Sequence, residues 1–238
     1  MSACTELPTE QADSLPQSPY LRDSGTDYAL EFDGTDDYAS TGNAGFPFPL
    51  DPYSLSLWVF YRDRPGARQS FLTLRRDEDA GIEFGVEDSV LTAWRYYDGS
   101  AYAAATSPLS AEAWHHVAYV FDGTRHVVLV DGARVGEGDL PANHRTPTMS
   151  WLGTADGSSD LFAGKLDEVR VWDVARSDAE IAAEAADTAA PDPAGLLLYL
   201  TFDESGGSRA FDRSPLGNHA TLGDGISGRM PTRVVSDR

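Results

Sequence analysis

The sequence has one cysteine among its 238 residues, Cys4, and its only lysine is Lys165. A single cysteine cannot form a disulfide within the chain, so no disulfide framework stabilises the fold. No apolar run approaches the roughly 20 residues of a membrane span, and no signal-peptide core is present. Zinc-binding Cys/His spacings, phosphate-binding glycine loops and the G-x-S-x-G nucleophile motif are also missing. These absences exclude disulfide-rich and helix-spanning folds and several enzyme classes.

Positive charge is scarce too, because 38 acidic residues face 18 basic ones and the net charge is −20. Nucleic acids and anionic membrane surfaces would be repelled by such a chain, so we expect neither as a partner. Cations and neutral molecules are the expected ligands. The length allows one large all-β domain or two small ones, and 41% hydrophobic residues indicate a globular core.

The first 25 residues are polar, rich in Pro and Ser, and without periodicity, so we expect a disordered tail or tether. Cys4 follows Ser-Ala, as at the processed end of a bacterial lipoprotein, where the cysteine is acylated. A free thiol on a disordered tail is the alternative. If Cys4 carries a lipid anchor, the protein lies at the cell surface.

From residue 26 to about 225, short alternating runs and turn signals predict many antiparallel strands. The runs include "YALEFDG", "YSLSLWVFYR" and "WHHVAYVF", and the Asp131-Gly132 pair predicts a tight hairpin turn. One helix is expected from Ser177 to about 189, because Ser177 and Glu180 form a capping box before an Ala-rich run. Residues 195–225 are expected to supply terminal strands, or to begin a second repeat, and 226–238 a polar tail.

Five motifs in fixed order carry a family resemblance: "ALEFDGTDDYAS", "YSLSLWVF", "AEAWHHVAYVFDGTRHVVLVDGARV", "FAGKLDEVRVW" and "RSDAEIAA". In this order they resemble the laminin-G-like domains of the concanavalin A-like lectin/glucanase superfamily, over roughly residues 28 to 190. The resemblance implies an all-β jelly-roll sandwich of two antiparallel sheets with one short C-terminal helix. It also implies an extracellular or cell-surface binding module.

The resemblance further implies a structural calcium ion near the "KLDEVRVW" strand. In that strand Asp167 alternates with two valines, so we expect its carboxylate on the core side, where it needs a partner. Calcium takes six to eight oxygen ligands, and we predict Asp167, Asp33 and Asp36 as ligands. The alternative is that these aspartates cap turns by accepting hydrogen bonds from backbone amides.

Catalysis is not expected. Retaining glucanases present two carboxylates on one strand face, usually in an E-x-D-x-E pattern, and this pattern is absent. A glycoside hydrolase is therefore only a remote alternative. The aromatic-rich stretch "LTAWRYYDGSAYAAAT" offers candidate sugar contacts, with Trp94 and Tyr96 on one strand face. The predicted ligand-binding residues are Trp94, Arg95, Tyr96, Asp98 and Tyr102, although buried rings in the core would give the same pattern.

Two functions stay open at this point. The first is a calcium-stabilised, non-catalytic module that recognises carbohydrate. The second is an adhesion or structural module that binds extracellular or cell-surface proteins, or copies of itself, without binding glycans. An open ring platform would favour the first function, and an extended apolar patch or an unpaired edge strand would favour the second.

Overall fold

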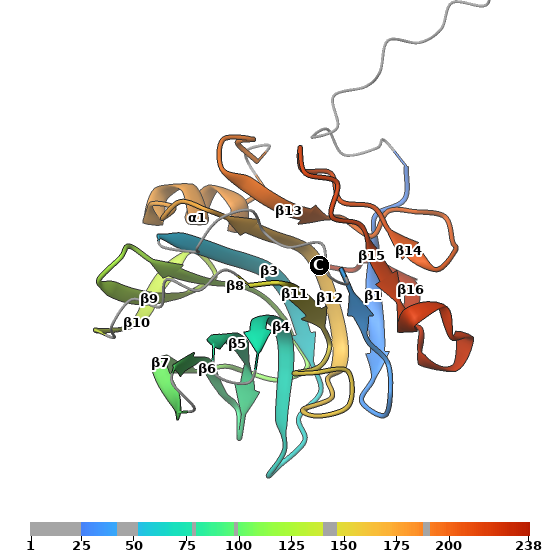
Figure 1. The fold of residues 1–238 in the computed structure, drawn as a ribbon, viewed down its shortest axis with the longest axis horizontal. Helices are drawn as coiled ribbons and strands as arrows, with labels where there is room; N and C mark the ends of the chain where they lie inside the picture. Colours follow the sequence, from blue (N-terminus) through green and yellow to red (C-terminus); the bar gives the residue numbers. More distant parts are fainter. Residues whose placement is uncertain (1–24, 42–51, 78–79, 98–99, 140–146, 188–190) are drawn as a thin grey trace, which may run out of the picture.

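A computed structural model describes residues 25–41, 52–77, 80–97, 100–139, 147–187 and 191–238. Two antiparallel sheets pack face to face, and one helix lies against the outside of the upper sheet (Figure 1). The predicted all-β jelly-roll sandwich is confirmed. Among the described residues, no helix has the length and apolar character that a membrane crossing requires.

Sheet A has the strand order β10-β9-β8-β3-β12-β1-β16, and β13 also pairs with β12. Its strands are β1 (Tyr28–Asp33), β3 (Tyr53–Tyr61), β8 (Trp114–Phe121), β9 (Arg125–Val130), β10 (Ala133–Asp139), β12 (Ala163–Trp172), β13 (Leu196–Leu200) and β16 (Thr232–Val235). Sheet B has the order β14-β15-β2-β11-β4-β5-β6-β7. Its strands are β2 (Ala39–Ser40), β4 (Arg68–Asp77), β5 (Ala80–Glu87), β6 (Val90–Tyr97), β7 (Ser100–Pro108), β11 (Met149–Leu152), β14 (Arg209–Ala210) and β15 (Ala220–Leu222).

The main core lies between the sheets and follows from the two-residue alternation of the strands. In β8, Val117, Tyr119 and Phe121 point into this core, whereas Ala118 and Val120 point to the opposite face. The opposite face is also apolar because a helix covers it. Helix α1 (Asp178–Ala185) places Ile181 in a second cluster on that outer face of sheet A.

Helix α1 begins where the capping box predicts. The Ser177 side chain accepts a hydrogen bond from the Glu180 amide, and the Glu180 carboxylate accepts one from the Ser177 amide. The β9–β10 hairpin beside it turns at Asp131-Gly132 with positive φ at both residues (50° and 77°), as in a type I′ turn. The helix ends at Ala185, earlier than predicted, and residues 188–190 lie outside the described ranges.

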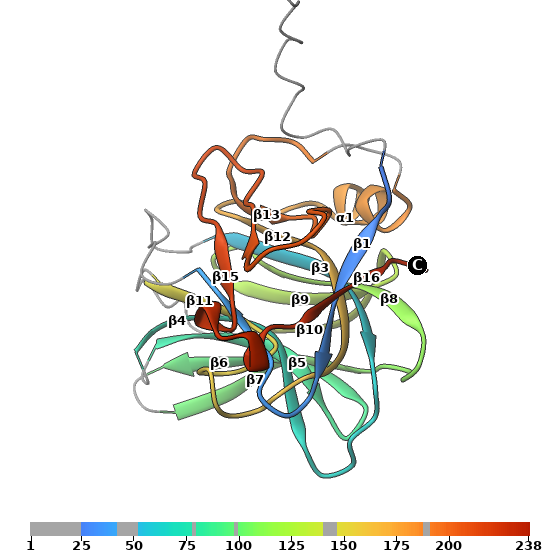
Figure 2. The same cartoon turned by 90° about the vertical axis from the view of Figure 1, so that its right-hand side faces the viewer.

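The C-terminal third completes both sheets. Residues 195–225 supply β13 to sheet A and β14 and β15 to sheet B, followed by the 3-10 turn η1 (Gly223–Gly225). The tail expected at 226–238 contains a second turn, η2 (Ser227–Arg229), and β16, which pairs with β1 (Figure 2). This corrects the expectation of a polar tail. Because β16 lies at the edge of sheet A, its side chains are partly exposed, and a largely polar segment can therefore form this strand. Residues 1–24, including Cys4, lie outside the described residues.

Candidate functional sites on sheet B and an acidic loop

The outer face of sheet B is the first candidate site. On β5, Ile82, Phe84 and Val86 enter the core, so Glu83 lies on the outer face. On β6, Leu91 and Ala93 also enter the core, so Trp94 and Tyr96 lie on the outer face of sheet B. The described residues place no helix over this face, whereas α1 covers the outer face of sheet A.

A hydrogen-bonded group of five residues, the Glu83 cluster, occupies this outer face. Its members are Arg68, Ser70, Glu83, Tyr96 and Asp160. One Glu83 oxygen accepts the Ser70 hydroxyl, and the other accepts the Tyr96 hydroxyl at 2.6 Å. Burial and the nearby Glu83 carboxylate raise the pKa of Tyr96 to about 12. Burial, and then repulsion from Glu83, raise the pKa of Asp160 to about 6.

Arginine guanidinium groups cover the two aromatic rings proposed as a sugar platform. Arg68 lies 4.2 Å from the Trp94 ring centroid, and Arg75 lies 3.9 Å from that of Tyr96. Trp94 is only 6% exposed, so its ring is not an open stacking surface. Among the described residues, the Arg75 guanidinium has no hydrogen-bond or ion-pair partner. The Nε atom is itself buried, whereas the Arg75 side chain as a whole is partly exposed, so a ligand on this face would meet the outer guanidinium nitrogens.

The other predicted ligand-binding residues are not gathered on this face. Arg95 points into the sandwich, is 3% exposed, and donates a hydrogen bond to the Tyr53 hydroxyl at 2.9 Å. Tyr102 lies in β7, opposite Arg95, and its side chain lies outside the described part of the structure. Asp98 also lies outside the described residues.

Trp151 lies on the same outer face of sheet B. It is directly opposite Thr73 of β4 and Ser40 of β2, and its side chain is partly exposed. The neighbouring Leu152 is in the core. Because neighbouring side chains of a strand point to opposite faces, a core position for Leu152 in "MSWL" predicts that Trp151 points outward.

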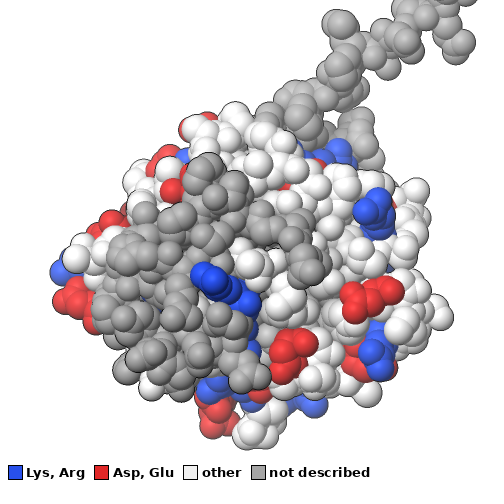
Figure 3. All heavy atoms as spheres, in the orientation of Figure 1, with Lys and Arg blue, Asp and Glu red and all other residues white. Residues whose placement is uncertain are grey.

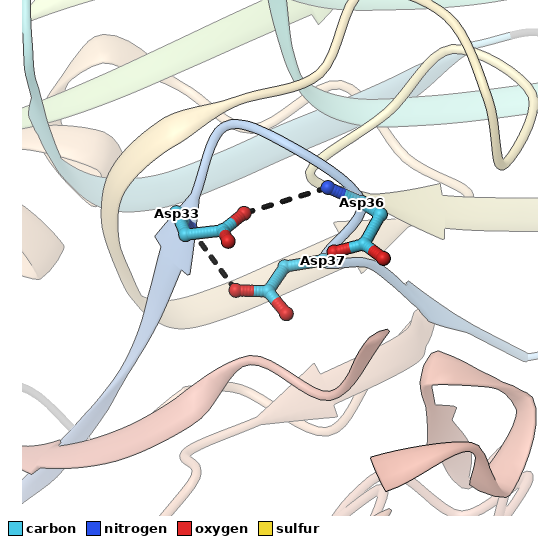
Figure 4. Close-up of side chains that lie close together, drawn as sticks. All are labelled: Asp33, Asp36 and Asp37. Atoms are coloured by element: carbon cyan, nitrogen blue, oxygen red, sulfur yellow. Dashed lines mark hydrogen bonds between the residues drawn. The ribbon is translucent and has the colours of Figure 1, made fainter. Parts of the chain in front are cut away.

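The second candidate site is the loop after β1, where Asp33, Asp36 and Asp37 bring carboxylate oxygens within 4.8 Å of one another (Figure 4). Asp33 accepts hydrogen bonds from the Thr35 amide at 2.7 Å and the Asp36 amide at 3.4 Å. Asp37 accepts one from the Asp33 amide at 3.0 Å, and burial raises its pKa. The loop thus combines a hard-cation donor set with the turn capping that is the alternative explanation.

Asp167 does not join this loop. Its carboxylate is fully buried and accepts hydrogen bonds from Arg238 at 2.6 Å and from Ser236 at 3.0 Å. A β-bulge interrupts the strand at Glu168, which has a φ of 52°, so that Leu166 and Val169 both face the core. The bulge turns Asp167 to the other side of sheet A, which corrects the expected core-facing position and its grouping with Asp33 and Asp36.

Comparison with known families decides the classification. A laminin-G family model, described as the concanavalin A-like lectin/glucanases superfamily, matches residues 33–182, more than half of the 238 residues. The chain belongs to this superfamily. The resemblance carried by the five motifs is therefore confirmed. No curated protein matches the sequence.

Several solved structures share the fold at low sequence identity. A Bacteroides ovatus protein assigned to carbohydrate binding has a TM-score of 0.63 at 19% identity, covering 90% of this chain and 61% of its own. This chain thus spans less than two thirds of that protein. The heptameric SAP-like pentraxin of Limulus polyphemus gives 0.59 at 14% identity, covering 85% and 96%. The CBM40 domain of the Ruminococcus gnavus IT-sialidase, bound to α2,3-sialyllactose, gives 0.55 at 16% identity, covering 68% and 99%.

Proposed function

We propose that this chain is a non-catalytic carbohydrate-binding module whose ligand lies across the outer face of sheet B, against Trp151, Arg75 and Tyr96. The observation that carries the proposal is the Arg75 guanidinium, which is stacked on Tyr96 and has no hydrogen-bond partner among the described residues. Such a group is held in place and can donate to sugar hydroxyls without breaking a hydrogen bond to any described residue. Trp151 adds a partly exposed ring for stacking against a sugar.

The same face argues for binding rather than hydrolysis. Glu83 is fully buried, and both of its oxygens already accept hydrogen bonds from Ser70 and Tyr96. It is therefore unavailable to a glycosidic bond, so Glu83 and Asp160 do not form the pair of accessible carboxylates that glycosidases use. Two of the similar structures bear carbohydrate-binding names, which supports a sugar as the ligand. An extracellular or cell-surface location is part of this proposal.

The test is a glycan array followed by calorimetric titration of the best ligand, with product analysis for cleavage. We expect binding without cleavage, and about tenfold weaker binding in Trp151→Ala and Arg75→Gln, since loss of one good contact is worth about 1.4 kcal/mol. Trp114→Ala and Arg134→Gln are matched controls on sheet A and should bind normally. Full affinity in both sheet B variants would place the glycan site elsewhere. Binding to a protein but to no glycan would instead support an adhesion role.

We also propose that Asp33, Asp36 and Asp37 hold a calcium ion. Three carboxylates offer the oxygen ligands that calcium prefers, with water completing its coordination. Asp36 is exposed, and no hydrogen bond to its carboxylate is seen in the described structure, so it is the group most available to a cation. Arg64 donates to the Gly34 carbonyl at 2.8 Å, which brings a competing positive charge to the loop.

Thermal unfolding with EDTA and with added calcium tests the metal proposal. A ligand at a thousandfold excess over its Kd stabilises the folded state by about 4 kcal/mol, so the midpoint should rise by several degrees. Asp36→Asn should remove this response without disturbing the turn, whereas Asp139→Asn, on an 84% exposed carboxylate, should keep it. Coinciding curves for the unmodified chain would leave these aspartates as turn caps.

A further inference from the structure

A pocket of about 390 Å³ opens at the other end of the outer face of sheet B. It lies where β2, β14 and β15 meet the 211–219 loop and η1, and its lining residues are Ser40, Thr41, Arg209, Gly217, His219, Thr221 and Asp224. Ser40 is directly opposite both Trp151 and Thr221, so the pocket continues the face proposed for glycan binding. Its volume is near the lower end for ligand pockets, which suits a sugar residue rather than a large ligand.

Arg209 is the charged group without a partner in this pocket. Its guanidinium makes no hydrogen bond or ion pair in the described structure. Its backbone, in contrast, is fixed, because the Arg209 carbonyl accepts a hydrogen bond from Arg233 at 2.5 Å. Arg233 is itself held by Glu204 at 3.1 Å and by the Gly207 carbonyl at 2.8 Å. A positioned strand therefore presents an unpaired cation to the pocket.

His219 adds an oriented hydrogen-bond donor. Its Nδ1 accepts the Asp212 amide at 3.0 Å, so the neutral ring carries its proton on Nε2. The Phe211 ring packs edge-on against the imidazole, with a centroid separation of 5.1 Å. No described residue accepts a hydrogen bond from this Nε2. The pocket thus has donors on two side chains, Arg209 and His219, that no described residue uses.

The carboxylate in the pocket is already in use. Asp224 accepts hydrogen bonds from the Tyr38 hydroxyl at 2.7 Å and from Ser40 at 3.1 Å. Among the described residues, Asp224 and Arg209 form no ion pair. Each Asp224 oxygen retains a lone pair that can accept a further hydrogen bond from a ligand hydroxyl.

The charge of the whole chain does not decide what this pocket binds. The net charge is −20, yet basic and acidic side chains are interspersed on the face seen in Figure 3. Charges farther away than about 8 Å are largely screened at physiological salt. Arg209, which is exposed and has no ion-pair partner among the described residues, is therefore a local positive charge that an anionic ligand group can bind.

We infer that this pocket binds a sugar residue that carries a carboxylate, such as a uronic acid. The planar Arg209 guanidinium suits two parallel hydrogen bonds to the carboxylate, with His219 as a further donor. Asp224, Ser40 and Thr221 can contact the ring hydroxyls. The inference rests on the proposed function for the assumption that the ligand is a sugar, and it adds specificity for acidic glycans.

The test is calorimetric or NMR titration of the full chain with methyl β-glucuronide and with methyl β-glucoside. The two differ at C6, where a carboxylate replaces a hydroxymethyl group. We expect the glucuronide to bind at least tenfold more tightly and Arg209→Gln to remove this preference. Arg125→Gln, a matched change on a 50% exposed side chain outside the pocket, should retain it. Equal binding of the two sugars, or an unchanged preference in Arg209→Gln, would overturn the inference.

The variants of the proposed function separate the two failures. If glycans bind and depend on Trp151 and Arg75, but the glucuronide is not preferred, the inference fails and the proposed function stands. If the glucuronide preference depends on Arg209 while Trp151→Ala and Arg75→Gln change nothing, the pocket stands and the proposed binding site at Trp151, Arg75 and Tyr96 fails. If neither array glycans nor the glucuronide bind, both fail.

Discussion

Replacing Asp160 by Asn should stabilise the protein at neutral pH and flatten its pH dependence. Asp160 faces Glu83 and Asp156 as like charges and Arg68 as the opposing one, and its pKa is raised to about 6. Between about pH 4 and 6 the folded state binds more protons at this site than the unfolded state, so stability falls as pH rises through this window. Asn removes the charge and accepts the left-handed φ of 50° at this position.

The difference between the raised pKa of about 6 and the ordinary value of 3.8 corresponds to a destabilisation of the folded state by about 3 kcal/mol at most. Asp160 is partly exposed, so solvent screening reduces the expected gain at pH 7.5 to roughly 1–2 kcal/mol. Urea denaturation at pH 4.5, 6 and 7.5 measures it. Asp203, whose pKa is also about 6, keeps part of the pH dependence in every variant. A pH profile parallel to that of the unmodified chain would show that the Asp160 charge does not destabilise the folded state. The exposed Asp139→Asn variant should give such a profile.

Two further predictions concern the packing. Gly153→Ala should destabilise the fold by about 2 kcal/mol more than Gly157→Ala in urea denaturation, because a Cβ at Gly153 lies 2.4 Å from the Phe32 ring, whereas at Gly157 the nearest atom is at 3.9 Å. Both glycines have positive φ, so equal losses would mean that the clash is relieved. Arg238→Ala should cost about 3 kcal/mol, because it leaves the buried Asp167 carboxylate without its ion-pair partner. A loss below 1 kcal/mol would show that Asp167 is neutral or solvated without Arg238.

The sheets and the helix could be predicted because their signals are local. Alternation along β3 and β8, the Asp131-Gly132 turn and the Ser177 capping box each depend on a few consecutive residues. The order of five such motifs then identified the superfamily. The edge strand β16 was missed because its residues carry no apolar alternation, and its pairing with β1 depends on residues about 200 positions away.

The candidate sites were only partly predictable, because strand parity can change within a strand. The bulge at Glu168 turns Asp167 away from the face that simple alternation assigns to it, and nothing local in the sequence marks the bulge. The arginines that cover Trp94 and Tyr96 come from β4, which pairing with β5 brings near β6. Asp33 and Asp36 were predictable as neighbours because one short loop holds both.

The pairing of β1 with β12 and β16, and of β2 with β11 and β15, has a consequence for synthesis on the ribosome. The first two strands gain their sheet neighbours only after more than one hundred further residues have been made. Closing such long loops is entropically expensive, so these pairings form late and slowly. During that time the apolar faces of β1 and β3 have no finished sheet to cover them, and a nascent chain of this design depends on chaperones or rapid completion to avoid aggregation.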